Sequence, residues 1–185
     1  RADAGALEKA IARLEHAVAL PDKYALHFYE LDALYQAAGA SPEKRLATLE
    51  ENAAVVARRD DALSRLIALQ VLLGHYDEAI AGMTDRQFDV WEGGTLTVAE
   101  DWINAHIHRG RARLAEGRPA EALADFEAAA NVPSNLPTEG RRGGRQVEIA
   151  WWMGKARHAM GDADQARAHW ESVASARATG DEQAY

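Results

Sequence analysis

The chain has 185 residues and no cysteine, with 21 Lys and Arg against 29 Asp and Glu and a formal net charge of −8. The absence of cysteine excludes a disulfide scaffold, a Cys-ligated metal site and thiol catalysis. The acidic balance opposes nucleic-acid binding, because the summed field of the protein repels a polyanion. No apolar run approaches the ~18 residues of a membrane span and no leader-like stretch opens the chain, so we expect a cytoplasmic protein without membrane contact.

Apolar residues recur at helical spacing from the start of the chain, and no segment alternates like a β-strand. The first stripe consists of Leu7, Ile11, Leu14 and Val18. We expect Asp3 to cap this helix and Pro21 to stop it. The second stripe consists of Tyr24, Phe28, Leu31, Tyr35 and Ala38. It ends at Gly39, a natural left-handed C-cap.

A third helix is predicted to begin with Ser41 as N-cap and Pro42 as its first residue, where the missing N–H of proline costs nothing. Its apolar positions are Leu46, Leu49, Ala53 and Val56, so we expect one continuous helix over them. A fourth helix closes at Gly74, and its apolar positions are Leu63, Leu66, Ile67 and Leu73. A short fifth helix runs from Tyr76 to Met83. The sequence predicts an all-α fold.

Three segments share one pattern, in which Gly follows a helix, Ala comes five positions later and a bulky residue four positions after that. They are Gly74–Ala79–Met83, Gly117–Ala122–Phe126 and Gly161–Ala166–Trp170. A looser copy surrounds Gly39. In a helical hairpin the Gly supplies the turn, the Ala lets the helices approach, and the bulky residue fills the groove to the next hairpin. Because one hairpin cannot bury its own apolar face, several must stack.

These segments resemble the tetratricopeptide repeat (TPR), a helix–turn–helix unit of about 34 residues. The resemblance covers nearly the whole chain after the first helix. It implies a single all-α domain over residues 1–185, a right-handed superhelical stack of antiparallel hairpins in about four repeats. The chain departs from the repeat consensus at the first-helix Trp position, which carries Phe28, Leu63, His106 and Ala150. The small residue four positions later matches only at Gly110 and Gly154.

Two of the repeats are longer than the usual unit. Gly39 to Gly74 is 35 positions, whereas Gly74 to Gly117 is 43 and Gly117 to Gly161 is 44. The roughly 9 or 10 extra residues are expected in two long loops between hairpins, at 84–95 and 132–145. Equivalent loops of stacked repeats lie on one edge, so these two loops should be neighbours. Long loops on a rigid scaffold often carry function.

The segments Asp85–Gly94, Pro133–Gly140 and Ala37–Pro42 are similar to the C-terminal repeat region of large bacterial proteins known as domain of unknown function 5107. In that family the repeats follow a β-rich region that is similar to carbohydrate-processing supersandwich folds. The family has Pro before the Trp and Gly after the Leu, where this chain has Val90 and Pro137. The resemblance implies that this chain is part of a longer protein and supports a carbohydrate-active β-rich domain.

The loop that contains Trp91 and Glu92 is one candidate site, because an aromatic face beside a carboxylate suits a sugar or a cation. The alternative is a structural plug, in which Phe88 and Trp91 seal the gap between repeats and Glu92 accepts loop N–H bonds. Glu139 lies in the companion loop. Glu92 and Glu139 are therefore candidates for the carboxyl pair of a glycoside hydrolase, which stand ~5 to 9 Å apart. The sequence does not fix their separation.

The first helices of the repeats provide a second candidate site. In the TPR class these helices line the concave surface, which implies one shared groove for Tyr29, Asn104, Arg111, Trp151, Lys155 and His158. A mixed aromatic and basic groove suits an extended peptide or an acidic group. The likeness to carboxylate-clamp repeats is partial, since only Asn104, Arg111 and Lys155 match that set. The alternative is a solvated concave face with Trp151 packed by the next hairpin.

No residue spacing in the chain is typical of a metal site or of a catalytic motif. The seven His residues show no ligand spacing, and His106 and His108, two apart, point to different sides of a helix. We therefore predict a non-catalytic interaction or scaffold module without cofactor or metal. Its partner is expected to be a protein or peptide, a β-rich domain of the same polypeptide, or a carbohydrate. The alternatives are an enzyme component acting through Trp91, Glu92 and Glu139, and a plain spacer.

Overall fold

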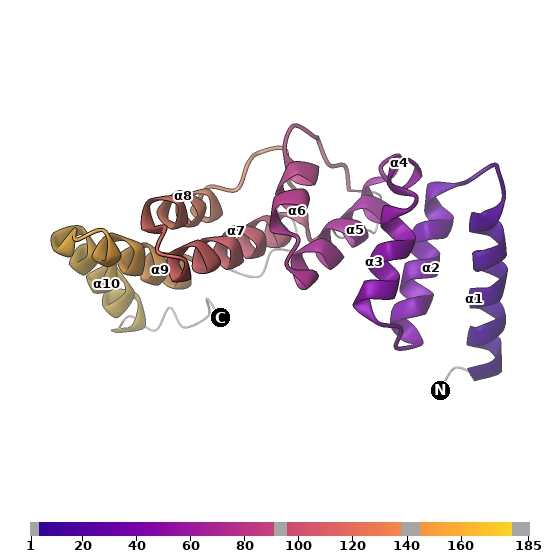
Figure 1. Ribbon diagram of the computed structural model, residues 1–185, viewed down its shortest axis with the longest axis horizontal. Coiled ribbons are helices and arrows are strands. Elements are labelled where there is room, and N and C mark those ends of the chain that lie inside the picture. Colours follow the sequence, from indigo (N-terminus) through magenta and orange to yellow (C-terminus); the bar gives the residue numbers. More distant parts are fainter. Residues whose placement is uncertain (1–3, 91–95, 138–144, 179–185) are drawn as a thin grey trace.

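The computed structural model of the protein describes residues 4–90, 96–137 and 145–178, and every regular element in these ranges is a helix. In chain order the helices are α1 (Ala4–Ala19), α2 (Ala25–Ala37), α3 (Pro42–Glu50), α4 (Ala53–Val56), α5 (Asp60–Leu73), α6 (Tyr76–Met83), α7 (Val98–Ala115), α8 (Pro119–Ala130), α9 (Gln146–Ala159) and α10 (Ala163–Ala178). They form an elongated stack with α1 at one end and α9 and α10 at the other (Figure 1). The repeats are the hairpins α2–α3, α5–α6, α7–α8 and α9–α10.

The structure confirms several of the predicted helix ends and turns. Helix α1 ends two residues before Pro21. Helix α3 begins at Pro42, and the Ser41 hydroxyl accepts a hydrogen bond from the backbone N–H of Lys44 at 3.3 Å. All four turn glycines have positive φ, a region that favours glycine, and they are Gly39, Gly74, Gly117 and Gly161. The expected cap Asp3 lies outside the described residues.

The prediction of one helix through Val56 was wrong. Helix α3 ends at Glu50, and a turn at Asn52 separates it from the short helix α4. The Asn52 side chain holds this turn, because its Nδ2 donates to the carbonyl of Thr48 at 3.1 Å and its Oδ1 accepts from Lys23 Nζ at 2.5 Å. Asn competes in this way with the helical hydrogen bonds of its own backbone. The turn redirects α4 so that Val56 is fully buried.

Each predicted Ala of the hairpin pattern lies in the interface between two helices, where Ala79, Ala122 and Ala166 are fully buried. The glycines on the facing helices allow a still closer approach. A Cβ at Gly110 would lie 2.6 Å from Phe126 Cε1, and one at Gly154 would lie 2.3 Å from Trp170 Nε1. Real Cβ atoms do not come this close to a neighbour. Within α7–α8 and α9–α10, the aromatic ring of the second helix therefore occupies the space that a side chain on the first would need.

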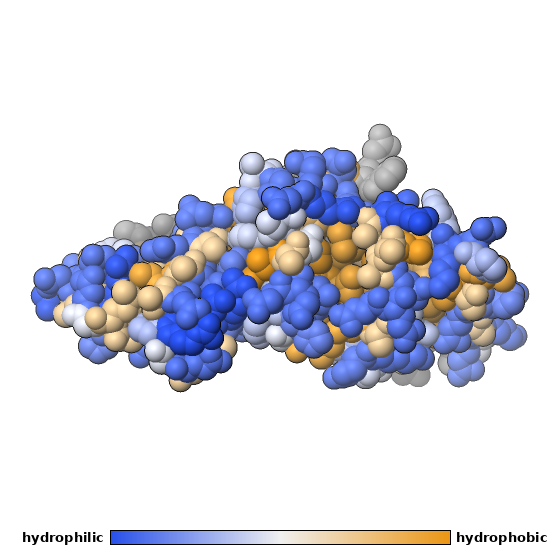
Figure 2. Space-filling model, turned by 45° about the horizontal axis from the view of Figure 1, so that its top comes forward, coloured by the Kyte–Doolittle hydropathy of each residue, from blue (hydrophilic) through white to orange (hydrophobic). Residues whose placement is uncertain are grey.

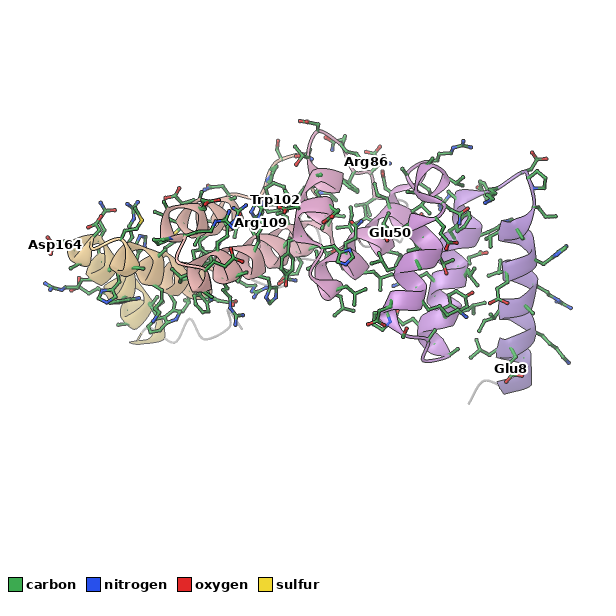
Figure 3. All side chains as sticks on the ribbon, in the orientation of Figure 1. Glu8, Glu50, Arg86, Trp102, Arg109 and Asp164 are labelled. Atoms are coloured by element: carbon green, nitrogen blue, oxygen red, sulfur yellow. The ribbon has the colours of Figure 1, made fainter. Side chains whose placement is uncertain are left out.

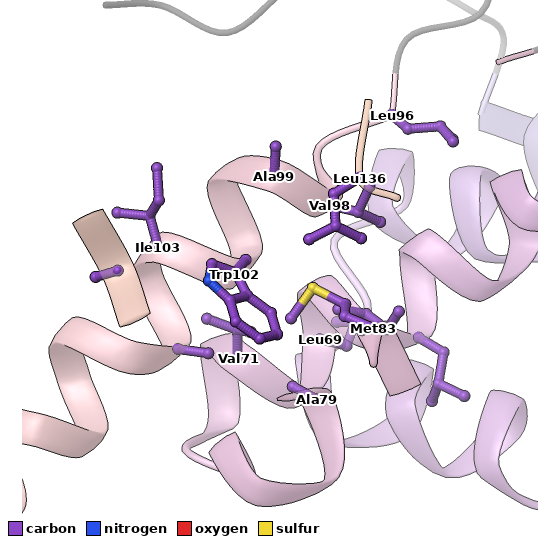
Figure 4. Packing of buried hydrophobic residues seen from close by; sticks show 14 of the residues in the cluster. Leu69, Val71, Ala79, Met83, Leu96, Val98, Ala99, Trp102, Ile103 and Leu136 are labelled. Atoms are coloured by element: carbon purple, nitrogen blue, oxygen red, sulfur yellow. The ribbon is translucent and has the colours of Figure 1, made fainter. Parts of the chain in front are cut away.

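One cluster of buried apolar residues runs from Phe28 of α2 to Ala156 of α9. Its middle part includes residues from outside the helices. Figure 4 shows Leu136 beside Val98, with Met83 and Trp102 close to them. Phe88 and Leu136 are each 2% exposed and Leu96 is 8% exposed. Apolar residues also reach the surface over the part of the stack where α5 and α6 lie, while hydrophilic residues cover much of both ends (Figure 2).

The described parts of the two long connections, between α6 and α7 and between α8 and α9, contact each other as predicted. The backbone N–H of Phe88 donates to the carbonyl of Asn135 at 3.2 Å. The Asn135 side chain donates in return to the carbonyls of Met83 at 3.0 Å and Arg86 at 2.7 Å. Residues far apart in the chain are thereby joined on one edge of the stack. No helix in the described ranges is long and apolar enough to cross a membrane.

Gly110→Ala tests whether the close approach of α7 and α8 limits stability. In an exposed helix this change would stabilise by about 1 kcal/mol. Here we expect a net loss of about 1–3 kcal/mol in the free energy of unfolding, because the new methyl group overlaps the Phe126 ring. Urea unfolding measures it. The double variant Gly110→Ala/Phe126→Leu should recover part of the loss relative to the sum of the single variants. Strict additivity would contradict the steric explanation.

Candidate functional site

The first connection is anchored at its base by Asp60, a buried residue at the start of α5. Asp60 Oδ1 accepts from Arg86 Nε at 2.9 Å and from Arg86 Nη2 at 2.5 Å, while Oδ2 accepts from the backbone N–H of Asp89 at 2.9 Å. The Arg86 guanidinium also lies 5.5 Å from the centroid of the Phe88 ring, and its place beside α5 can be followed in Figure 3. One carboxylate thus fixes this segment to the stack.

The described parts of both connections contribute buried side chains and hydrogen bonds to the stack. Phe88 is buried, as the plug interpretation of this loop expects for that residue. Trp91, Glu92 and Glu139 lie outside the described residues. Their proposed pairing as catalytic carboxyls therefore stays a prediction from the sequence.

Asp101, in the first turn of α7, is buried close to the end of the first connection. Its Oδ2 accepts a hydrogen bond from the Thr97 hydroxyl at 2.7 Å. Burial raises the pKa of Asp101 to about 6, with the Thr97 hydrogen bond acting in the lowering direction and the charge of Glu100 adding to the rise. Burial disfavours the charged form of Asp101, so its carboxyl group loses its proton only as the pH approaches neutral.

A groove of about 620 Å³ lies between α7 and α9, on the first helices of the last two hairpins. Its lining residues are His108, Arg111, Ala112, Leu114, Ala115 and Trp152. Leu114, Ala112 and Ala115 provide an apolar surface, and Arg111 and His108 provide the polar groups. This mixture is typical of sites that orient a ligand through a few polar groups on an apolar wall.

Arg111 is held in this groove by an aromatic ring. Its guanidinium carbon lies 4.9 Å from the centroid of the Trp152 ring, which itself stacks on Phe126 with centroids 6.0 Å apart. Within the described ranges Arg111 has no ion pair, whereas Arg109 and Arg113 of the same helix both bind Asp125. Arg111 therefore offers its donors to the groove while the indole restricts their position.

His108 lies beside Arg111 with its ring stacked on Tyr76 at a centroid distance of 5.9 Å. Burial lowers the pKa of His108, and the positive charges of Arg111 and Arg145 lower it further, against an opposing effect of Glu148. The imidazole is thus neutral at pH 7. The positive charge of the groove comes from Arg111.

Asn104 lies one turn before His108 on α7 and is already occupied within the protein. Its Oδ1 accepts a hydrogen bond from Arg145 Nη1. Arg145 also forms ion pairs with Glu148 at 2.6 Å and with Glu100 at 3.4 Å. This cluster joins the start of α9 to α7 and neutralises Arg145.

The other predicted groove residues fall into two separate places. Trp151 is 46% exposed and faces Trp170 of α10 at a ring distance of 5.9 Å, and His158 contacts the same ring at 5.8 Å. Lys155 is exposed on α9. Tyr29 lies at the other end of the stack, where it lines a cavity between α1 and α2.

Sequence reasoning missed His108 and Trp152, which line the groove with Arg111. The spacing that joins Asn104 to Arg111 in the sequence also places Ile107 on the same face of α7, but Ile107 is fully buried. The exposed face of α7 is shifted by one residue and includes Asn104, His108 and Arg111. The repeated polar residues at this spacing, four and then three apart, were the available signal.

A buried charge cluster between α7 and α8 was also missed. Asp125 is 2% exposed, and its carboxylate lies 2.9 Å from His106 Nδ1, 2.6 Å from Arg109 Nη2 and 2.8 Å from Arg113 Nη1. Burial acts to raise the pKa of Asp125, but the hydrogen bonds from His106 and Arg109 outweigh it, so the pKa is lowered.

Arg109 and Trp102 lie near each other on α7 in Figure 3. No group of residues in the described ranges has the composition of a metal site.

These features define the chain as a TPR-like helical stack: antiparallel hairpins, left-handed turn glycines and small residues at the helix contacts. A search against known protein families found no match, so the similarity to domain of unknown function 5107 gains no support. Two solved structures of MamA are similar to this chain in fold. One has a TM-score of 0.57 and 12% identity, covering 96% of this chain and 92% of MamA. The other has a TM-score of 0.54 and 13% identity, covering 91% and 81%. At these identities the likeness establishes the fold.

Asp125→Asn should destabilise the protein by about 2–4 kcal/mol at pH 7, because the change leaves buried cationic donors without their anion. Asp77→Asn is the matched control, since Asp77 also binds Arg109 but its side chain is 76% exposed. We expect that control to cost less than about 1 kcal/mol. Urea unfolding measures both. The contribution of Asp125 to stability is present above the ordinary carboxyl pKa and is lost as the pH falls below it. The unfolding free energies of the two variants should therefore become equal in strong acid. Equal losses at pH 7 would contradict this assignment.

Asp101→Asn should stabilise the protein at pH 7.5. The folded-state pKa of about 6 exceeds the ordinary value of 3.8. The folded state therefore binds more protons than the unfolded state between these values, and the stability of the wild type falls as the pH rises through that window. Asp101→Asn should therefore raise the free energy of unfolding by about 1–2 kcal/mol at pH 7.5 and change it very little at pH 4. Unfolding free energies at the two pH values measure it, and a variant less stable at pH 7.5 would contradict the assignment.

Proposed function

We propose that this protein is a non-catalytic scaffold module that binds an acidic peptide segment of a partner protein in the groove between α7 and α9. The observation that carries the proposal is Arg111, whose guanidinium stacks on Trp152, lines the groove and has no ion pair in the described part of the chain. A carboxylate is the natural complement of such a guanidinium, since the two can form paired charge-assisted hydrogen bonds.

The apolar part of the groove supports a peptide over an isolated anion. Leu114, Ala112 and Ala115 lie next to Arg111 and suit an apolar side chain beside the acidic one. The neutral state of His108 leaves its ring available as a hydrogen-bonding and stacking surface without a second charge. The TPR-like fold supports the same interpretation, because stacked helical repeats provide extended surfaces that bind other proteins.

Trp151, Lys155 and His158 extend the proposed surface along α9. All three are exposed, and Trp151 and His158 contact the ring of Trp170 on α10. Asn104 contributes indirectly, by holding Arg145 next to Glu148. We propose that the acidic side chain binds at Arg111 and that the peptide continues past the exposed end of α9.

A carbohydrate-active β-rich domain of the same polypeptide is a finer proposal that rests on the sequence resemblance alone. In that setting the module would support the neighbouring domain, and Trp91, Glu92 and Glu139 would complete its site. None of these three residues lies in the described ranges.

The groove proposal is tested by selecting peptides from a random displayed library on the wild-type protein and measuring their affinity by fluorescence anisotropy. We expect the selected peptides to carry Asp or Glu beside an apolar residue. Arg111→Ala should weaken their binding about 10- to 100-fold, as expected for the loss of a charge-assisted hydrogen bond. Arg167→Ala, on the exposed surface of α10, is the matched control and should bind as the wild type does. Unchanged affinity in Arg111→Ala would overturn the proposal.

A further inference from the structure

A second cavity, of about 480 Å³, lies at the N-terminal end of the stack between α1 and α2. It is lined by Ala10, Arg13 and Leu14 of α1 and by Tyr29, Glu30, Ala33 and Leu34 of α2. Its surface is largely apolar, because Ala10, Leu14, Ala33 and Leu34 form most of it. Helix α1 packs along α2 at the end of the stack (Figure 1), and Leu14 and Leu34 are only partly buried.

The two charged residues that line this cavity have opposite sign and come from opposite helices. Arg13 stands on α1 and Glu30 stands on α2, and both are exposed. Neither takes part in an ion pair or a side-chain hydrogen bond within the described ranges, although both line the same cavity. The hairpin therefore presents an apolar strip with an unpaired cation on one edge and an unpaired anion on the other.

We propose that this face binds a second copy of the same chain. A twofold axis that runs parallel to the α1–α2 hairpin places each α1 over the α2 of the other copy. This rotation exchanges the two edges of the strip, so Arg13 of each copy meets Glu30 of the other, and the apolar residues meet across the axis. An isologous interface contains each contact two times, so the dimer has two Arg13–Glu30 contacts and the charges are opposite in both. Four helices then enclose the apolar residues that one hairpin leaves partly exposed.

The size of the face predicts a weak dimer. A helix of 13 residues is about 20 Å long, and two adjacent helices are about 20 Å wide, which gives a footprint of roughly 400 Å² per copy. The total of roughly 800 Å² lies below the ~1,200 Å² of stable specific interfaces, in the range of weak and transient complexes. We therefore expect association in the micromolar range, sensitive to salt, since the paired charges lie at the rim.

The test is a charge exchange measured by sedimentation equilibrium at low ionic strength over about 10 to 500 µM protein. The wild type should show a monomer–dimer equilibrium. Arg13→Glu and Glu30→Arg should each weaken dimerisation at least about tenfold, because each creates two like-charge contacts per dimer. The double variant Arg13→Glu/Glu30→Arg should restore it, because the exchanged charges match again.

Arg167→Glu and Glu171→Arg are matched controls that make the same charge changes on the exposed surface of α10. Both should dimerise as the wild type does, and circular dichroism should show every variant to be folded. A wild type that is monomeric up to the highest concentration would overturn the proposal. So would single variants that dimerise as the wild type does, or a double variant that fails to regain association.

Discussion

The structure depends on close contact between helical hairpins that are too small to be stable alone. A hairpin buries one side of each helix and leaves the other apolar side for its neighbours, so stability comes from the contacts between units. In two hairpins a glycine on the first helix admits an aromatic ring from the second, as with Gly110 and Phe126. In the α5–α6 hairpin the large residue is on the first helix and the glycine is on the second. A Cβ at Gly82 of α6 would lie 3.5 Å from the side chain of Ile67 of α5. The space between the two helices of a hairpin therefore limits the combined volume of the two facing residues.

The long connections satisfy the same requirement where helices do not. Helix α6 has only eight residues, and the apolar space beyond its end is filled by Phe88 and Leu136, one from each connection. Their backbones are tied together through Asn135 and to α5 through Asp60. The extra residues between hairpins therefore carry part of the core, and the buried cluster continues through the middle of the stack.

Buried aspartates fix the orientation of neighbouring helices in two places and the position of a connection in a third. Asp32 of α2 binds Arg45 of α3 at 2.7 Å and lies 2.9 Å from Arg65 of α5. Asp125 of α8 binds Arg109 and Arg113 of α7, and Asp60 of α5 binds Arg86 in the connection after α6. Such partners offset the cost of burying an ionised carboxylate, and the clusters of Asp32 and Asp125 therefore favour one register between their helices. Because these arginines are paired within the protein, Arg111, which stacks on Trp152 and has no described ion pair, differs from them and forms the charged centre of the proposed groove.

Local residue patterns predicted much of the fold. Gly39, Gly74, Gly117 and Gly161 marked the turns because each requires a backbone conformation that favours glycine, and Ala79, Ala122 and Ala166 marked the helix contacts because only small side chains fit there. The pairing of Asp125 with arginines on another helix, and the choice of Trp152 over Trp151 as the partner of Arg111, depend on how two helices are rotated against each other. A shift of one residue, as at Ile107 and His108, changes the face by about 100°. Spacing within one helix does not fix that rotation.

The most direct test of a core that continues through the connections is hydrogen exchange at the Phe88 amide, which lies outside the helices and donates to Asn135. We predict that this amide exchanges as slowly as the buried amides of α5 and α7, because its hydrogen bond breaks only when the stack opens. Exchange at the rate of an unstructured loop would instead show that the connections do not belong to the core.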